Sequence, residues 1–228
     1  MKLRHQDNYM NESETRAEYI DPKLKASGWG IVEETKVLRE FRITEGKIQT
    51  GGMRGKPEIA DYILVYKNHK IAVIEAKQES LPATEGAAQA KSYAGKLHID
   101  YTYATNGKEI YQISMKTGHE GNVDRFPTPD ELWNKTYTDQ NEWKEKFAGV
   151  PLEGEYGKRY YQEIAINNAL DAIAEEKKRI LLTLATGTGK TFTMAHQAYR
   201  LMKAGVGRRI LFLVARRALA AQAVRAFA

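Results

Sequence analysis

Apolar and polar positions alternate between residues 61 and 77 in a pattern that predicts a β-hairpin. Two runs rich in β-branched and aromatic residues, 62–66 and 71–74, flank a polar turn at 67–70. Charged side chains stand at both ends of this apolar hairpin: Asp61 precedes the first run, and Glu75 and Lys77 follow the second. Because side chains alternate along a strand, Glu75 and Lys77 are expected on one face of the sheet.

The pairing register decides whether Asp61 joins them. A regular two-residue turn at Asn68-His69 would place Asp61 opposite Ala76, on the wrong face. Convergence of Asp61 and Glu75 therefore requires an odd loop, a β-bulge or a backbone bend near Asp61.

Two carboxylates that converge on one point bind a hard divalent cation, and a lysine beside them orients or deprotonates a water molecule. The hairpin therefore predicts metal-assisted hydrolysis of a phosphodiester, with Asp61 and Glu75 as metal ligands. The alternative interpretation of the hairpin alone is a salt-bridged edge hairpin with solvated ends.

The surrounding pattern predicts a compact α/β unit with a mixed central sheet. A helix is expected after Ser13, with a break near Pro22, followed by one or two strands within 31–44. A second helix is expected over 81–97, with Gln89 and Tyr93 four residues apart on one face. Asn106-Gly107 predicts the turn of a second hairpin, formed by residues 101–105 and 109–115. Residues 117–126 are expected to be loop, and a short helix is expected to begin at Pro129.

The pattern changes after residue 150. An amphipathic helix over 160–174 precedes a fully apolar segment at 180–184, which is typical of a buried parallel strand. A helix to about residue 203, a second apolar strand at 209–214 and a final helix from 217 complete a βαβα beginning. We therefore expect two domains, 1–149 and 159–228, joined by a linker at 150–158 that is rich in proline, glycine and charge.

A phosphate-binding loop is predicted between the first of these strands and its helix. Its residues are Thr186, Gly187, Thr188, Gly189, Lys190 and Thr191. The glycines free backbone amides to face phosphates, the lysine adds a charge, and Thr191 supplies a hydroxyl for Mg²⁺. Leu184 replaces the usual first glycine of this motif, and the alternative is a plain glycine turn. About two dozen residues upstream, Gln162 is a candidate for reading adenine through its amide, and the alternative is a polar helix start.

Charge and composition say less about function than these motifs do. Of the net charge of +6, residues 1–150 contribute 22 Lys and Arg against 23 Asp and Glu, so the positive excess lies in the C-terminal third. The absence of cysteine excludes disulfides and thiolate metal sites, and no apolar run reaches membrane-spanning length. The five histidines show no ligand spacing. We expect a cytoplasmic protein without a membrane partner.

The order of these motifs resembles the R subunit of type I restriction enzymes along the full length of the chain. The front part is similar to the PD-(D/E)xK nuclease fold: Asp61 matches the first acid and Glu75-Ala76-Lys77 matches the (D/E)xK element. The rear part is similar to the opening of a superfamily 2 helicase motor, a RecA-like parallel α/β domain. This resemblance implies an α/β protein made of a restriction-endonuclease-like domain and an incomplete motor domain.

The resemblance also implies roles for individual residues. Asp61, Glu75 and the Ala76 carbonyl would ligate Mg²⁺, and Lys77 would position the attacking water. Gln89 and Tyr93 match the Q-x-x-x-Y element that meets DNA or orders the site, and Glu14 lies where many members place an acid on their first helix. Gln162 would read adenine, and residues 213–219 would form motif Ia, in which Ala215 replaces an expected Asp.

The implied substrate is double-stranded DNA, the implied partners are methylase and specificity subunits, and ATP is the implied cofactor of the whole protein beside Mg²⁺. No acid pair of the Walker B type follows, and R subunits are several times longer. The sequence is therefore expected to be an N-terminal fragment that cleaves little DNA alone. The alternative is a non-catalytic truncated module that binds partner subunits or DNA without cutting.

Overall fold

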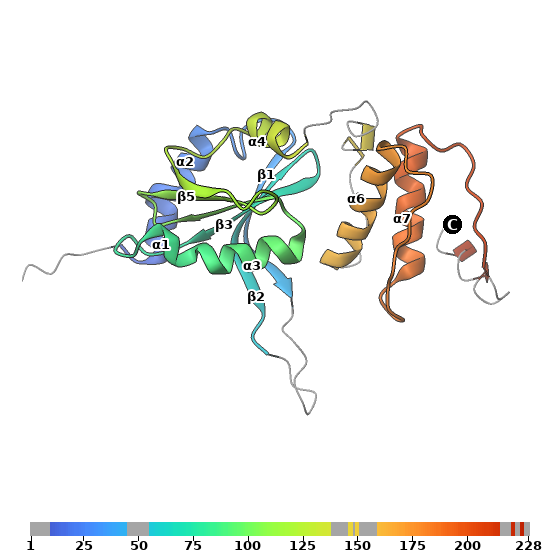
Figure 1. Cartoon of the computed structure of the whole chain (residues 1–228), viewed down its shortest axis with the longest axis horizontal. Helices are drawn as coiled ribbons and strands as arrows, with labels where there is room; N and C mark the ends of the chain where they lie inside the picture. Colours follow the sequence, from blue (N-terminus) through green and yellow to red (C-terminus); the bar gives the residue numbers. More distant parts are fainter. Residues whose placement is uncertain are drawn as a thin grey trace, which may run out of the picture. The chain divides into compact units, whose positions relative to one another are not determined.

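The computed structural model describes residues 10–44, 55–137, 146–147, 149–150, 159–214, 220–221 and 224–225. The chain divides into two compact units, Met1–Thr138 and Asp139–Ala228 (Figure 1). This division falls earlier than the expected linker at 150–158, of which residues 151–158 lie outside the described residues. Phe147, which the expected boundary assigned to the first domain, packs with Ile166 and Leu170 of the second unit.

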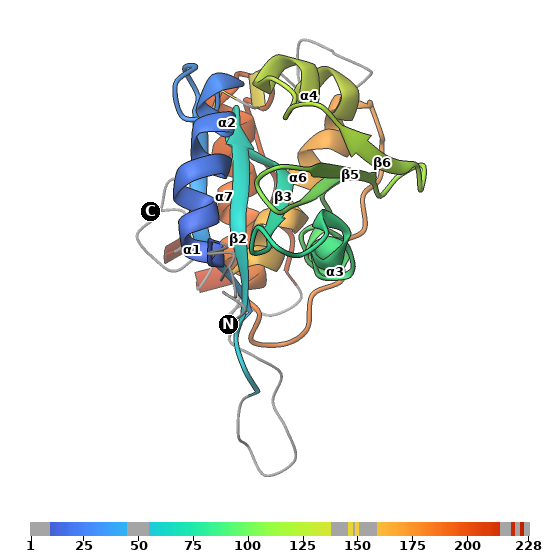
Figure 2. The ribbon, with the colours of Figure 1, turned by 90° about the vertical axis from the view of Figure 1, so that its left-hand side faces the viewer.

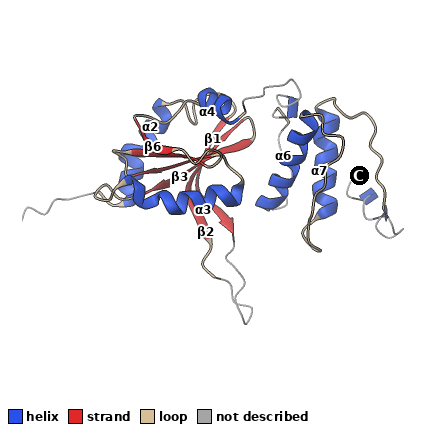
Figure 3. Cartoon of the chain, viewed as in Figure 1, coloured by secondary structure: helices blue, strands red, loops and turns tan. Residues whose placement is uncertain are grey.

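A six-stranded mixed sheet forms the centre of the N-terminal unit (Figures 1 and 3). Its strands are β1 (Thr35–Thr44), β2 (Glu58–Tyr66), β3 (His69–Ala76), β4 (Tyr101–Thr105), β5 (Ile110–Ser114) and β6 (Glu120–Val123), and they follow one another in sequence order across the sheet. Only the β3–β4 pair is parallel. The mixed sheet and both hairpins agree with the sequence prediction.

Strand β6 is a correction, because residues 117–126 were expected to be loop. Its four residues, Glu-Gly-Asn-Val, pair in antiparallel register with β5. This segment has almost no apolar side chain to show a period of two. Backbone hydrogen bonding to an existing edge strand therefore decides its conformation, and the pattern could not predict it.

The first helical region contains a π-helical segment. It consists of α1 (Glu12–Thr15), the π-helix η1 (Arg16–Ile20) and α2 (Asp21–Ala26). Asn11 caps the start through its side chain. Pro22 does not split the helix into two separate pieces, because it lies in the first turn of α2, where its missing amide hydrogen is tolerated.

Helices cover both faces of the sheet. A 3₁₀ turn, η2 (Ala83–Gly86), and α3 (Ala87–Leu97) connect β3 to its parallel neighbour β4. On β2, the hydroxyls of Tyr62 and Tyr66 bond to Asp21 of α2 and to Asp130 of α4 (Pro129–Thr136). Figure 2 shows α1 and α2 on one side of β2 and β3, with α3 on the other. Residues of β2 that alternate with these tyrosines, Asp61 among them, therefore lie on the face toward α3.

The β2–β3 hairpin contains the bulge that the register argument required. The turn is Lys67-Asn68, one residue earlier than expected, and both residues adopt the positive φ of a tight primed turn. Tyr66 pairs with His69, but the register then shifts, and Leu64 pairs with Ala72. Without this shift Asp61 would lie opposite Ile74. The one-residue bulge instead brings Asp61 opposite Glu75, on the same face.

In the C-terminal unit, helices α6 (Tyr160–Ala174) and α7 (Lys190–Lys203) form as predicted. They enclose a small apolar core that includes Phe147, Ile166 and Leu170. Within the described part of this unit no strand forms, which corrects the prediction of buried strands at 180–184 and 209–214. Leu181 is 90% exposed, and Leu211 and Leu213 are each 82% exposed. A strand requires a neighbour for its backbone groups, and the described residues of this unit supply none.

Across the described ranges, no helix combines the length and the apolar character that crossing a membrane requires.

Candidate functional site

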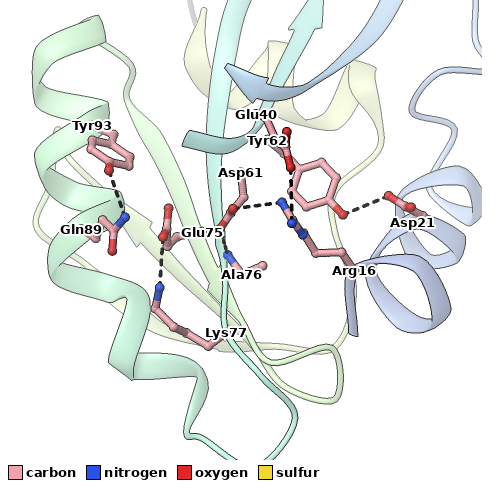
Figure 4. A network of polar contacts seen from close by, with 10 residues as sticks. All are labelled: Arg16, Asp21, Glu40, Asp61, Tyr62, Glu75, Ala76, Lys77, Gln89 and Tyr93. Atoms are coloured by element: carbon pink, nitrogen blue, oxygen red, sulfur yellow. Dashed lines mark hydrogen bonds and ion pairs between the residues drawn. The ribbon is translucent and has the colours of Figure 1, made fainter. Parts of the chain in front are cut away.

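The candidate site lies where β2 begins and β3 ends, on the face of the sheet toward α3. β2 supplies Asp61, and the end of β3 with the residue after it supplies Glu75, Ala76 and Lys77 (Figure 4). Helix α3 adds Gln89 and Tyr93, and the first helical region adds Arg16. The bulge and the parallel β3–β4 pairing together place these groups at one end of the sheet.

Both carboxylate oxygens of Asp61 contact the protein. Oδ2 accepts a hydrogen bond from the backbone amide of Ala76 at 2.7 Å, which ties the start of β2 to the end of β3. Oδ1 accepts a hydrogen bond from the Arg16 guanidinium at 3.2 Å. These two donors fix the orientation of the carboxylate.

Glu75 is the most unusual charged group of the site, since only 3% of the residue is exposed. Its Oε1 accepts a hydrogen bond from Lys77 Nζ at 3.0 Å, whereas Oε2 is buried and has no hydrogen-bond partner within the described structure. Burial, and then the nearby charge of Asp61, raises the pKa of Glu75 to about 8 against the opposing attraction of Lys77. A buried carboxylate oxygen without a donor is costly, and it is a natural ligand for a cation.

Lys77 is fixed at both its backbone and its side chain. Its backbone amide donates to the Thr105 carbonyl at 2.8 Å, and its Nζ donates to Glu75. Burial lowers the pKa of Lys77, but the attraction of Glu75 outweighs it, so the net pKa is raised above the ordinary lysine value. The raised pKa favours the cationic form of Lys77, whose Nζ donates a hydrogen bond to Glu75.

A close approach of backbone to side chain holds Glu75 in place. A Cβ added to Gly86 would lie 3.2 Å from Glu75 Cγ and 3.4 Å from Ala104 Cβ. A larger residue at the start of α3 would therefore displace the Glu75 side chain. The sequence pattern had given no reason to single out Gly86.

Gln89 and Tyr93 interact with each other on α3. The amide nitrogen of Gln89 donates to the Tyr93 hydroxyl at 2.9 Å (Figure 4). The predicted spacing of four residues therefore gives one joint polar group beside Glu75. This leaves the Gln89 carbonyl oxygen and the Tyr93 hydroxyl hydrogen available for other partners.

Glu14 lies at the start of the first helix and caps it. Its carboxylate accepts a hydrogen bond from the Asn11 backbone amide at 2.9 Å, as part of a reciprocal capping box. Glu12 is the acid of this helix whose charge raises the pKa values of both Glu75 and Lys77. Sequence reasoning did not identify Glu12 or Arg16. A short helix with three charged positions carries no pattern that shows which of them faces a distant strand.

The donor set is suited to Mg²⁺. Within the described residues no group of three or more Asp, Glu or His side chains is arranged to hold a metal ion. The acidic groups that the site provides are the carboxylates of Asp61 and Glu75. Mg²⁺ commonly uses one or two carboxylates and completes its octahedron with water and phosphate oxygens. Two carboxylates, a lysine and an unpartnered buried oxygen fit this requirement.

The second group of predicted residues forms a glycine-containing loop at the start of α7. Gly187 and Gly189 have φ of 80° and 84°, a conformation that favours glycine. Thr188 Oγ1 donates to the Ala185 carbonyl at 2.6 Å, and Lys190 Nζ donates to the carbonyls of Leu184 and Ala185 at 3.0 and 2.9 Å. Thr186 is exposed, and Thr191 lies half-buried in the first turn of α7. Lys190 thus folds back on its own loop.

Gln162 of α6 contacts this loop across a long sequence separation. Its amide nitrogen donates to the Thr188 carbonyl at 2.8 Å, and its amide oxygen accepts from the Arg159 backbone amide at 3.3 Å. A Cβ at Gly189 would lie 2.4 Å from the same amide nitrogen, and the φ of 84° at this position disfavours any residue other than glycine. The structure thus brings Gln162 to the loop. Ala215 lies outside the described residues.

Comparisons with known proteins indicate the family of the chain. Residues 37–127 match the family model described as the N terminus of the type I restriction enzyme R protein, and residues 155–228 match that of the type III restriction enzyme res subunit. The endonuclease subunit of the type I restriction enzyme EcoAI from Escherichia coli is 33% identical over 93% of this chain and 28% of the relative. That of EcoKI from Escherichia coli strain K12 is 30% identical over 96% of this chain and 24% of the relative.

A solved structure gives the same result. A fragment assigned as an HsdR subunit of a type I restriction enzyme from Vibrio vulnificus YJ016 superimposes with a TM-score of 0.81 at 38% identity, over 88% of this chain and 40% of that one. The chain belongs to the R-subunit family of type I restriction enzymes and corresponds to the N-terminal region of that subunit. It spans about a quarter of the length of the two curated relatives.

Proposed function

We propose that the N-terminal unit is a Mg²⁺-dependent nuclease that hydrolyses phosphodiester bonds of double-stranded DNA within a restriction complex. The observation that carries this proposal is the register after the one-residue bulge, in which Tyr62 pairs with Ile74 so that the adjacent Asp61 and Glu75 share a face, with Lys77 bonded to Glu75. A strand register that brings two carboxylates and a lysine to the end of a buried sheet is costly without a function.

The residues divide the chemistry among them. Asp61, Glu75 Oε2 and the Ala76 carbonyl would hold Mg²⁺, which when bound would lower the pKa of a water molecule and neutralise charge on a phosphate. Lys77, held as a cation by Glu75, would orient the attacking water and face the negative charge that develops on the phosphate. Gln89 and Tyr93 would contact DNA through the polar groups that their mutual hydrogen bond leaves available.

The C-terminal unit would begin the ATP-driven motor of the full subunit. Its loop at residues 186–191 would bind phosphates through backbone amides and Lys190, once Lys190 leaves the carbonyls of Leu184 and Ala185. Gln162 would bind adenine through its side-chain amide, which would give up its hydrogen bond to the Thr188 carbonyl for one to the base. Translocation, and assembly with methylase and specificity subunits, belong to the whole protein and are part of this proposal.

A second candidate is a non-catalytic module that binds DNA or partner subunits without cutting. One observation favours it: both oxygens of Asp61 already contact Arg16 and Ala76. The two candidates differ in whether Asp61 accepts a metal ion.

Mn²⁺ binding to the purified chain, followed by calorimetry, separates the candidates. We expect one site, which D61N and E75Q each weaken at least about 100-fold, because each removes a charged ligand from a buried position. The matched control is E79Q: Glu79 is a nearby carboxylate that bonds to Met10 and Lys108 instead. Equal Mn²⁺ binding by wild type and D61N would contradict the nuclease proposal.

Cleavage is then measured with full-length R subunit, with and without its methylase and specificity subunits and ATP. We expect plasmid linearisation only with all components, and its loss in D61N. Robust Mg²⁺-dependent linearisation by the present chain alone would show that the site needs no partner.

A further inference from the structure

Arg16 is the one cationic side chain of the site that no sequence motif indicated. It donates from Nη1 to Asp61 Oδ1 at 3.2 Å, while the Ala76 amide occupies Oδ2 (Figure 4). The side chains of Arg16 and Asp61 are 20% and 14% exposed, so solvent screens this ion pair only partly. A divalent cation approaching Asp61 would compete with the guanidinium for the same oxygen.

Arg16 has a second acceptor nearby. Its Nη2 lies 3.5 Å from Glu40 Oε1, and the Glu40 side chain is 70% exposed. Glu40 lies in β1 between Arg39 and Phe41, which pair with Tyr62 and Ala60, so Glu40 is level with Asp61 across the sheet. Its φ of 49° is uncommon for a residue other than glycine and interrupts the regular strand at this position.

The surrounding structure fixes the place from which Arg16 reaches the site. Asp21, at the start of α2, accepts a hydrogen bond from the Tyr62 hydroxyl at 3.0 Å and forms an ion pair with Arg39. Tyr62 and Arg39 are the sequence neighbours of Asp61 and Glu40. Arg16 also begins the π-helical segment, and such segments are rare and frequent at functional sites. The helix is thus anchored to both strands, next to both carboxylates.

We propose that Arg16 is a positioning residue that gates the metal site. Without metal, the Arg16 guanidinium neutralises the Asp61 carboxylate. A divalent cation must displace the guanidinium from Asp61 Oδ1, and Glu40 then accepts the displaced guanidinium. This inference rests on the proposed nuclease function and deepens it. Arg16 lowers the metal affinity by competing with the cation for Asp61, and Glu40 raises it by binding the Arg16 guanidinium.

The test is Mn²⁺ affinity, measured by calorimetry and by electron paramagnetic resonance of free Mn²⁺. Variant R16M keeps much of the apolar stem and removes the competing charge, so we expect Mn²⁺ to bind about five- to twentyfold more tightly. E40Q removes the second acceptor and should weaken Mn²⁺ binding about two- to threefold. In the R16M background E40Q should have no effect, which a double-mutant cycle measures.

R125M is the matched control. Arg125 also forms an ion pair with a carboxylate on a helix, Glu131 of α4, and has no part in the site or in the anchoring of Arg16. We expect the Mn²⁺ affinity of this variant to equal that of wild type. Near-ultraviolet circular dichroism establishes that each variant is folded, and R16K, which keeps a charge without the planar fork, should fall between R16M and wild type.

Unchanged or weaker Mn²⁺ binding by folded R16M would overturn the gating role. If binding in wild type is abolished by D61N while R16M changes nothing, the nuclease site stands and only the gate fails. If neither wild type nor R16M binds Mn²⁺, the metal site and the gate fail together.

Discussion

The predicted strands form and pair in the N-terminal unit, whereas those predicted in the C-terminal unit do not form within its described residues. In the N-terminal unit every strand has a neighbour, and the functional side chains come from elements that the unit itself contains. In the described part of the C-terminal unit the glycine-containing loop at 186–191 and helix α7 form, but the flanking apolar segments form no strand and expose Leu181, Leu211 and Leu213. A local motif can therefore adopt its conformation without the sheet that normally supports it. A site whose residues are aligned by strand register cannot form without that sheet.

Hydrogen exchange should show the largest difference between the units. The amides of Val73 and Ile74 lie in a strand with neighbours on both sides and should exchange at least about 10⁴-fold more slowly than those of residues 180–184. Exchange followed by mass spectrometry with peptide resolution measures this. Comparable protection in both segments would mean that 180–184 pairs with another element.

The ionisation of Glu75 provides a second test, confined to the N-terminal unit. Its folded pKa of about 8 exceeds the ordinary 4.5, so the folded state binds the proton more tightly than the unfolded state. Stability should therefore fall as pH rises from about 4.5 to about 8 and stay level above, with a total loss of up to about 5 kcal/mol.

The variant E75Q should lack this loss. Urea denaturation with chelator present, at pH 5, 6.5 and 8, is expected to show E75Q gaining relative to wild type at each step. A constant difference across this range would show that Glu75 is ionised throughout, held so by Lys77.

Alanine substitutions of two glycines in the same helical region should change the stability less, and in opposite directions. G86A adds a Cβ that presses on Glu75, and we expect about 1–2 kcal/mol of destabilisation together with weaker Mn²⁺ binding. G95A adds a Cβ that meets nothing within 4 Å in the interior of α3, and we expect a gain of up to about 1 kcal/mol. Thermal unfolding measures both, and equal effects would remove the argument for a close approach at Gly86.

The smallest effect is expected at the phosphate loop. Because Lys190 bonds to its own loop and the flanking segments at 180–184 and 209–214 form no strand, nucleotide binding by this chain should be weak, and K190A should change it by only about threefold. A fluorescent ATP analogue measures the affinity, with Mn²⁺ binding to the N-terminal unit as the unchanged control. Micromolar binding that K190A abolishes would show that the C-terminal unit is already competent.

Local patterns in the sequence determined much of this protein. The alternation around residues 61–77, the Asn106-Gly107 turn and the amphipathic period of residues 160–174 predicted elements that the structure contains. Because side chains alternate between the two faces of a strand, Asp61 and Glu75 could share a face only if the hairpin register was irregular. These predictions succeeded because each depends on neighbours close in sequence, whose spacing fixes which side of a strand or helix they occupy.

Tertiary structure alone decided the rest. The position of the bulge, the contact of Gly86 with Glu75 and the reach of Arg16 to Asp61 all join residues that no periodic pattern links. Strand β6 formed because an edge was available, and residues 180–184 formed no strand because the described residues of their unit offer no edge. Burial and long-range pairing depend on which surfaces meet in space, and the spacing of residues along a chain does not contain that information.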